Sequence, residues 1–332
     1  MSTKTLATFT LIMSTILVMS SENWFSMWMG LEINMISFIP LMQEKKNYNI
    51  PESMMMYFLI QSLGSIMFIF TIITTPIMVI NEMSMSKEMM IIISMSMMMK
   101  MGVAPMHMWF INIMSKISWM SCMMIMTWQK IAPMWILTNL NQNSMIINTC
   151  AMMSAVMGAI GGINQTSVKK IMAFSSVNHL GWMIICMKYN NEMWMKYLMI
   201  YSIMVVMLTK MFFNNSINYM NQMNLNLKNT MSKMNIIIMM MSLGGLPPFL
   251  GFLPKWIVIS TMMKEGSMVI MMILLLTSMI NMFYYMRMTA PIIMSWNTMN
   301  KWNLKSGEKK IENLIMIMMN LSLPITSMLS MI

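Results

Sequence analysis

The sequence predicts an all-α polytopic membrane protein with about eleven transmembrane helices, arranged as inverted five-helix repeats with two discontinuous helices. Of its 332 residues, 58% are hydrophobic and only 9% are charged, whereas soluble domains carry about 25% charged residues. Apolar runs of about 20 residues recur along the chain, each long enough to cross ~30 Å of hydrocarbon. Three runs, the fourth, fifth and ninth, contain prolines close to a lysine, and in the fourth and ninth the pattern is typical of the paired broken helices of transporters.

The apolar runs define the expected elements in order. The candidate spans are residues 5–21, 24–42, 54–80, 89–113, 117–139, 144–163, 170–187, 193–213, 234–263, 267–288 and 311–331. The first run lacks a small-residue cleavage site, so it is expected to be a retained span. The ninth is too long for one plain helix. No low-complexity linker divides residues 1–332, so a single transmembrane domain is expected.

Methionine dominates the composition, with 65 residues. A methionine-rich copper site is one interpretation, but the methionines are spread along the chain rather than clustered. Lysine far outnumbers arginine and aspartate is absent, which favours an AT-rich genome that reads an extra codon as Met, as animal mitochondria do. Cys122, Cys150 and Cys186 occur singly without CxxC spacing, so no metal or cluster site is expected.

The loops carry their positive charge asymmetrically, with 13 basic residues on one side and 4 on the other. The richer side collects Lys4, Lys45, Lys46, Lys116, Lys169, Lys170, Lys228, Lys233, Arg287, Lys301, Lys305, Lys309 and Lys310. The poorer side collects Lys87, Lys188, Lys196 and Lys264. The positive-inside rule places the N-terminus on the matrix or cytoplasmic side and the C-terminus opposite. This bias accounts for most of the net charge of +11, so no nucleic-acid partner is expected.

Apart from the basic residues assigned to the two sides, four lysines, Lys100, Lys130, Lys210 and Lys255, fall inside the spans, as does one acid, Glu32. A charge at mid-bilayer costs about 2.5–3.5 kcal/mol on insertion scales, so several in one chain indicate function. Lys100 comes twelve residues after Glu88, about 18 Å along a helix. Glu32, Lys130 and Lys255 are expected at similar depth. Lys210 lies near the end of its span, where its ammonium can reach the interface, and an auxiliary relay role is the alternative.

Proline and glycine accompany the deep lysines. The expected helix breaks are Pro105, Pro133, Gly244, Gly245, Pro247, Pro248 and Pro254. Pro105 cannot donate a hydrogen bond to the Met101 carbonyl, and Pro133 cannot donate to that of Gln129. Broken helices at membrane depth are tolerated where they line protein interior or water.

Two roles fit the buried charges: structural ion pairs between helices, or a proton relay. Burial disfavours the charged form of a lysine and a nearby carboxylate favours it, so a changing distance between Glu32 and Lys100 would act as a switch. His107 and His179 fit either an auxiliary relay role or a satisfied polar group between helices. "GAIGG", residues 158–162, fits close helix packing. No nucleotide, haem or iron–sulfur motif is present in the sequence.

Five motifs resemble those of the NADH–ubiquinone oxidoreductase chain 2 family. They are "WMGLEINMISFIP", "KMGVAPMHMW", "TWQKIAPM", "KKIMAFSSVNHLGWM" and "GGLPPFLGFLPKW". The resemblance implies an antiporter-like core subunit in the membrane arm of respiratory complex I, in the mitochondrial inner membrane of an insect or similar animal. It also implies eleven helices, because animal members lack three of the fourteen found in bacteria.

The resemblance further implies a proton relay through Glu32, Lys100, Lys130 and Lys255, driven by redox chemistry in other subunits. NADH, FMN, iron–sulfur clusters and ubiquinone would bind to those subunits, and this chain would have no redox site of its own. Structural lipids are a possible ligand, and the chain 4 and chain 4L subunits are the implied neighbours. Two alternatives stay open: a stand-alone cation/proton antiporter, and a scaffold whose lysines only pair helices.

Overall fold

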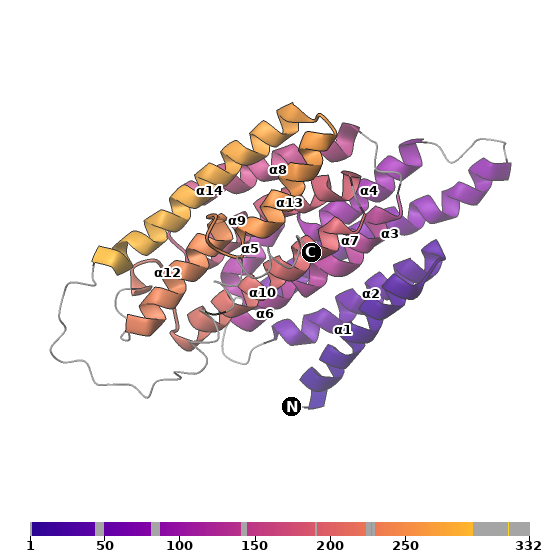
Figure 1. The fold of residues 1–332 in the computed structure, drawn as a ribbon. Helices are drawn as coiled ribbons and strands as arrows, with labels where there is room; N and C mark the ends of the chain where they lie inside the picture. Colours follow the sequence, from indigo (N-terminus) through magenta and orange to yellow (C-terminus); the bar gives the residue numbers. More distant parts are fainter. Residues whose placement is uncertain are drawn as a thin grey trace. The chain divides into compact units, whose positions relative to one another are not determined.

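The computed structural model describes residues 2–43, 50–80, 87–140, 145–189, 191–223 and 230–294, together with positions 227 and 318. Within these residues the secondary structure is helical, apart from an isolated bridge between Ser167 and Tyr219 (Figure 1). The all-α fold class is therefore confirmed for the described part. The chain divides into two compact units, Met1–Ser154 and Ala155–Ile332.

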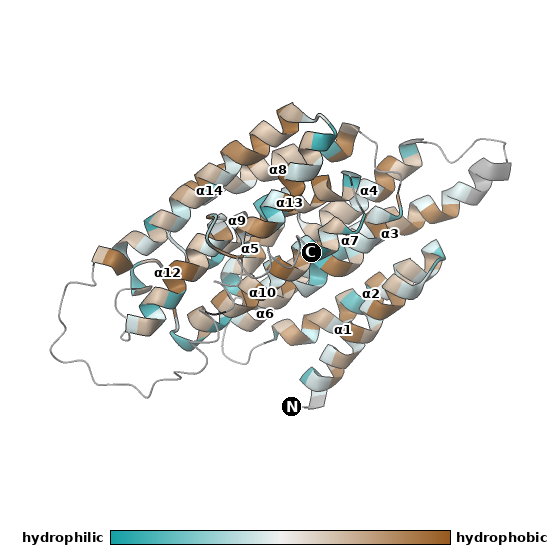
Figure 2. Cartoon of the chain, viewed as in Figure 1, coloured by the Kyte–Doolittle hydropathy of each residue, from teal (hydrophilic) through white to brown (hydrophobic). Residues whose placement is uncertain are grey.

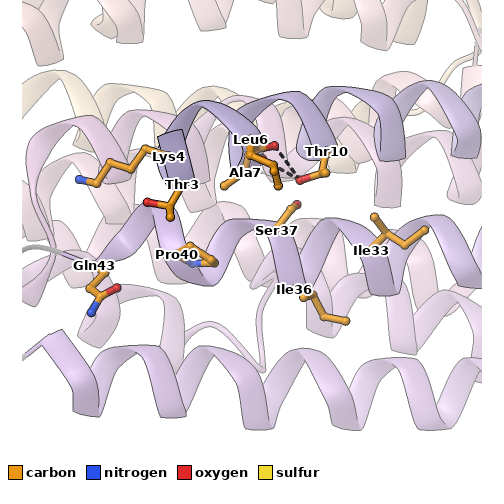
Figure 3. Close-up of a pocket in the computed structure, with 10 residues that line it drawn as sticks. All are labelled: Thr3, Lys4, Leu6, Ala7, Thr10, Ile33, Ile36, Ser37, Pro40 and Gln43. Carbon is orange, nitrogen blue, oxygen red and sulfur yellow. Dashed lines mark hydrogen bonds between the residues drawn. The ribbon is translucent and has the colours of Figure 1, made fainter. Parts of the chain in front are cut away.

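The first unit begins with a helical hairpin. The hairpin consists of α1 (Ser2–Ser20) and α2 (Trp24–Met42). The rest of the unit contains α3 (Ile50–Ile80), α4 (Lys87–Met101), α5 (Met108–Lys116), α6 (Trp119–Met126), the 3₁₀ turn η1 (Trp128–Lys130), α7 (Ile131–Thr138) and the start of α8 (Met145–Ile163). The absence of a side chain at Gly30 lets α2 approach α1, because a Cβ atom there would come 2.5 Å from Val18. A pocket of about 860 Å³ opens between the two helices, with Lys4 at one end (Figure 3).

The second unit is built around one buried helix. Its elements are the end of α8, α9 (Val168–Tyr189), α10 (Met193–Asn214), α12 (Thr230–Gly244), α13 (Phe252–Lys264) and α14 (Met268–Met294). Residues 171–187 of α9 are all buried. Gly158 of α8 lies so close to α9 that a Cβ atom would come 2.6 Å from the backbone nitrogen of Asn178. The "GAIGG" motif thus packs two helices closely, as expected.

Among the described residues, six helices are long and apolar enough to cross a membrane: α1, α2, α3, α8, α10 and α14. Large apolar side chains such as Phe9, Phe70 and Phe283 point outward from them, and apolar residues are prominent along these helices (Figure 2). Buried polar residues such as Thr71 and Thr277 donate to carbonyls of their own helices. Apolar side chains outside and polar side chains inside are the reverse of the pattern in a soluble protein, and they fit a chain that is surrounded by lipid.

Three further expected spans are interrupted. Residues 89–113 divide into α4 and α5, residues 117–139 into α6, η1 and α7, and residues 234–263 into α12 and α13. Each piece is shorter than a bilayer requires alone. The expected span 311–331 lies outside the described residues except for Met318.

Candidate functional site

Lys100 lies at the broken end of α4 and is only 6% exposed. Gly102, with a φ of +73°, follows the helix. Its N–H donates to the Met99 carbonyl at 3.2 Å. The N–H of Val103 donates to the Met98 carbonyl at 3.0 Å. This is a Schellman motif, so α4 ends through a left-handed glycine before the chain reaches Pro105.

The Schellman motif leaves the last carbonyls of α4 without partners from their own helix. In a continuing helix, the Lys100 carbonyl would accept from the N–H of residue 104. Here Gln61 of α3 donates its side-chain amide to that carbonyl at 2.9 Å. The aliphatic stem of Lys100 crosses Gly64, one turn further along α3, where a Cβ atom would come 2.9 Å from Lys100 Cγ. A neighbouring helix therefore holds both the backbone and the stem of Lys100.

Glu32 supplies the negative charge that acts on Lys100. It lies half-buried on α2 and interacts electrostatically with the Lys100 ammonium. Within the described part of the chain, no ion pair within 4.0 Å joins the two residues. The two charges therefore lie more than 4.0 Å apart, and the strength of their interaction falls as the separation grows.

Lys130 is 2% exposed, less than Lys100. It ends the 3₁₀ turn η1, and its ammonium lies 6.0 Å from the centroid of the Phe110 ring. Next to it, the Tyr57 hydroxyl donates to the side-chain oxygen of Gln129 at 3.3 Å. Pro133 lies in the first turn of α7, where proline is well tolerated. The interruption therefore precedes Pro133.

Lys255 occupies the broken helix of the second unit and is 5% exposed. Gly245, with a φ of +84°, closes α12 in a second Schellman motif. The Lys255 ammonium donates to the Gly244 carbonyl at 2.6 Å and lies 6.0 Å from the Trp182 ring centroid. Pro254 stands in the first turn of α13.

Two prolines lie within the interruption of the second unit. Residues 245–251 separate α12 from α13, and Pro247 and Pro248 belong to this segment. Gly244 is the last residue of α12. The break therefore begins at the glycine pair, with the two prolines after it.

The remaining candidates separate into buried and exposed residues. His107 is buried, with Nδ1 3.2 Å from the Pro105 carbonyl oxygen. His179 is buried on α9, with Nδ1 2.8 Å from the Tyr197 hydroxyl and its ring 4.8 Å from that of Tyr201. Lys210 is exposed.

Sequence reasoning missed the residues that hold the lysines in place. Gln61, Gly64, Gly102 and Trp182 all contact or position a buried lysine or its helix end. A polar Gln61 inside the apolar run of 54–80 was an available signal. A glycine two residues after a lysine, as in "KMG", was another, because lysine in the last turn and glycine just beyond it mark helix C-termini.

The fold and the site define a helical membrane protein of the transporter class, with interrupted helices and buried lysines. Residues 21–281 match the family described as "NADH:quinone oxidoreductase/Mrp antiporter, TM". A chain named NADH-ubiquinone oxidoreductase chain 2 from Anopheles gambiae is 40% identical over 327 residues, covering 97% of this chain and 95% of the relative. The protein of the same name from Locusta migratoria is 38% identical over 330 residues, covering 99% and 94%.

The chain therefore belongs to the NADH-ubiquinone oxidoreductase chain 2 family, within the wider NADH:quinone oxidoreductase/Mrp antiporter membrane family. A chain of respiratory complex I from Thermus thermophilus has the same fold, with a TM-score of 0.80 and 17% sequence identity. That match covers 96% of this chain and 78% of the bacterial one.

Proposed function

We propose that this chain is a proton-translocating core subunit in the membrane arm of respiratory complex I, NADH:ubiquinone oxidoreductase, in the mitochondrial inner membrane. The observation that carries the proposal is Lys100, a buried lysine at a broken helix end within electrostatic range of Glu32. Membership of the chain 2 family supports the assembly in which it works.

In the proposed relay, Lys100 holds a proton while Glu32 is near and releases it toward Lys130 when that pairing weakens. The two charges lie more than 4.0 Å apart in the structure; an approach to ~4 Å at an effective dielectric of ~20 would be worth about 4 kcal/mol. A change in that separation is thus large enough to decide whether a buried lysine keeps its proton. Lys255 of the second unit is the fourth relay member, and His107 and His179 are auxiliary candidates.

We also propose the finer architecture that the sequence predicts. Residues 1–332 form one antiporter-like domain of eleven spans, in which the interrupted fourth and ninth spans correspond as inverted repeats. The N-terminus faces the matrix and the C-terminus the intermembrane space, because the lysine-rich loops lie on the N-terminal side. Protease accessibility in mitoplasts tests the orientation. Cleavage within residues 289–310 from the intermembrane side would overturn it.

The redox chemistry belongs, in this proposal, to other subunits, which bind NADH, FMN, the iron–sulfur clusters and ubiquinone. The chain 4 and chain 4L subunits are the proposed neighbours, and structural lipids the proposed further ligands. A stand-alone cation/proton antiporter is the second candidate, favoured by the Mrp antiporters that share the family description. Co-purification with NADH:ubiquinone oxidoreductase activity separates the two.

Replacement of Lys100 tests the relay itself. Lys100→Ala should leave an assembled complex, checked on native gels, that moves fewer protons per electron pair. Ser62→Ala is the matched control, because Ser62 donates to the Leu59 carbonyl of its own helix. Unchanged stoichiometry in Lys100→Ala would favour the third candidate, a scaffold whose lysines only pair helices.

A further inference from the structure

One face of α3 lies against the broken end of α4. Tyr57, Gln61 and Gly64 are spaced four and three residues apart, so they share one side of the helix. The Tyr57 hydroxyl reaches Gln129, next to Lys130, at 3.3 Å. The side-chain amide of Gln61 reaches the Lys100 carbonyl at 2.9 Å. This face of α3 therefore contacts the segments that carry Lys100 and Lys130, the two lysines of the first unit that are buried among the described residues.

The hydrogen bond from Gln61 pairs the Lys100 carbonyl, which lies in an apolar interior and has no donor from its own helix. The Schellman motif uses the N–H groups of Gly102 and Val103 for earlier carbonyls, so neither is available to Lys100. Gln61 is itself buried. Without its amide, the Lys100 carbonyl would lose the donor that the structure provides in this water-poor site.

Gly64 controls the other part of Lys100, the aliphatic stem. A Cβ atom at position 64 would lie 2.9 Å from Lys100 Cγ and 3.2 Å from Lys100 Cε. It would also lie 3.4 Å from the carbonyl oxygen of Ser96, so α4 itself is close. The stem can lie flat against α3 only because position 64 has no side chain, and this fixes the direction in which the ammonium leaves α4.

We propose that Gln61 and Gly64 form a positioning cradle for Lys100, in which Gln61 holds the broken helix end by its carbonyl and Gly64 sets the path of the lysine stem. The proposal rests on the proposed proton relay. It assigns α3 a role in that relay, although α3 contributes no titrating member to it.

A neutral cap suits a residue that must exchange a proton. The Gln61 amide carries no charge and donates whatever the protonation state of Lys100. The broken end of α4 is therefore held equally well before and after the lysine loses its proton. The Lys100 ammonium forms no hydrogen bond or ion pair within the described part of the chain, so it is available to respond to Glu32.

The test uses the whole complex reconstituted into vesicles, with NADH as electron donor and protons per electron pair as the readout. Gln61→Leu keeps the size of the side chain and removes the donor, and Gly64→Ala displaces the stem but leaves the cap. Both should lose as much stoichiometry as Lys100→Ala, with NADH oxidation in uncoupled vesicles unchanged. Gln61→His, which restores an N–H at similar reach, should recover the parent value, and Ser62→Ala should equal the parent.

The outcomes separate this proposal from the relay on which it rests. If Lys100→Ala pumps like the parent, the proposed function fails before the cradle is tested. If Lys100→Ala loses stoichiometry but Gln61→Leu and Gly64→Ala match Ser62→Ala, the cradle is overturned and the relay stands. If Gln61→Leu does not assemble, Gly64→Ala and Gln61→His decide the question. A Gly64→Ala complex with parental stoichiometry, or no recovery in Gln61→His, would then contradict the cradle.

Discussion

The interrupted helices of the two units end in the same way but satisfy their freed carbonyls differently. Gly102 closes α4 and Gly245 closes α12, each in a Schellman motif with positive φ. In the first unit a neutral amide, Gln61, caps the carbonyl left over. In the second unit the lysine itself does so, with Lys255 donating to the Gly244 carbonyl at 2.6 Å.

This difference separates the structural and titrating roles of a buried lysine. Lys255 both carries charge and holds its helix break together, because a charge-assisted hydrogen bond joins it to α12. At the first break these tasks are divided between two side chains, Gln61 and Lys100. Proton release from Lys100 therefore leaves the helix end capped, whereas proton release from Lys255 weakens a contact between α12 and α13.

The largest expected effect comes from the closest backbone approach in the second unit. A Cβ atom at Gly251 would overlap the Ser242 carbonyl group, which is backbone and cannot move aside. At Gly64 the nearest atoms belong to the flexible stem of Lys100. Gly251→Ala should therefore cost about 3 kcal/mol of stability and Gly64→Ala about 1 kcal/mol.

The amount of assembled complex on native gels and its thermal inactivation measure this pair of variants. Equal assembly of Gly251→Ala and Gly64→Ala would show that the break of the second unit is not held by backbone packing.

An intermediate effect is expected from matched replacements of the two lysines by methionine. Lys255→Met leaves the Gly244 carbonyl without its donor and should cost about 1–3 kcal/mol. Lys100→Met keeps the Gln61 cap on the Lys100 carbonyl, so the first break should lose less protection than the second. Hydrogen exchange of peptides covering 241–251 and 98–104 measures both. Equal loss of protection at the two breaks would remove the distinction between them.

The smallest effect is expected from the exposed ion pair between α3 and α5. Lys116, the last residue of α5, pairs with Glu52 of α3 at 2.6 Å, and the Glu52 side chain is 64% exposed. An exposed pair contributes about 0–1 kcal/mol, so Glu52→Gln should change thermal stability little, and less still at high salt. A loss as large as that of Gln61→Leu would mean that the Glu52 contact with α5 matters as much as the Gln61 contact with α4.

The sequence predicted the helical membrane class because long apolar runs and few charges leave no other architecture. It also located the three deep lysines, since a charge within an apolar run is visible without a structure. The physical reason for each break was harder to predict. Pro105 and Pro133 were expected to leave backbone carbonyls without donors. In the structure α4 ends through Gly102, before Pro105, and Pro133 lies in the first turn of α7, where proline is well tolerated.

The partners of the broken ends were beyond sequence reasoning. Gln61 lies 39 positions from Lys100, and Gly244 lies 11 from Lys255. Which donor meets which carbonyl depends on how helices pack, and the apolar pattern fixes only which residues are buried. Of the eleven expected spans, the last lies outside the described residues except for Met318, so the helix count stays a prediction.

The central claim is that Lys100 carries a proton that it can release, and Lys100→Arg tests it most directly. Arginine keeps the positive charge and can still pair with Glu32, but its guanidinium does not give up a proton at any relevant pH. The measurement is protons moved per electron pair by the assembled complex in vesicles, with assembly verified on native gels. The relay predicts that Lys100→Arg assembles and loses stoichiometry as Lys100→Ala does. A Lys100→Arg complex that pumps like the parent would contradict it, and Lys100 would then be a structural cation.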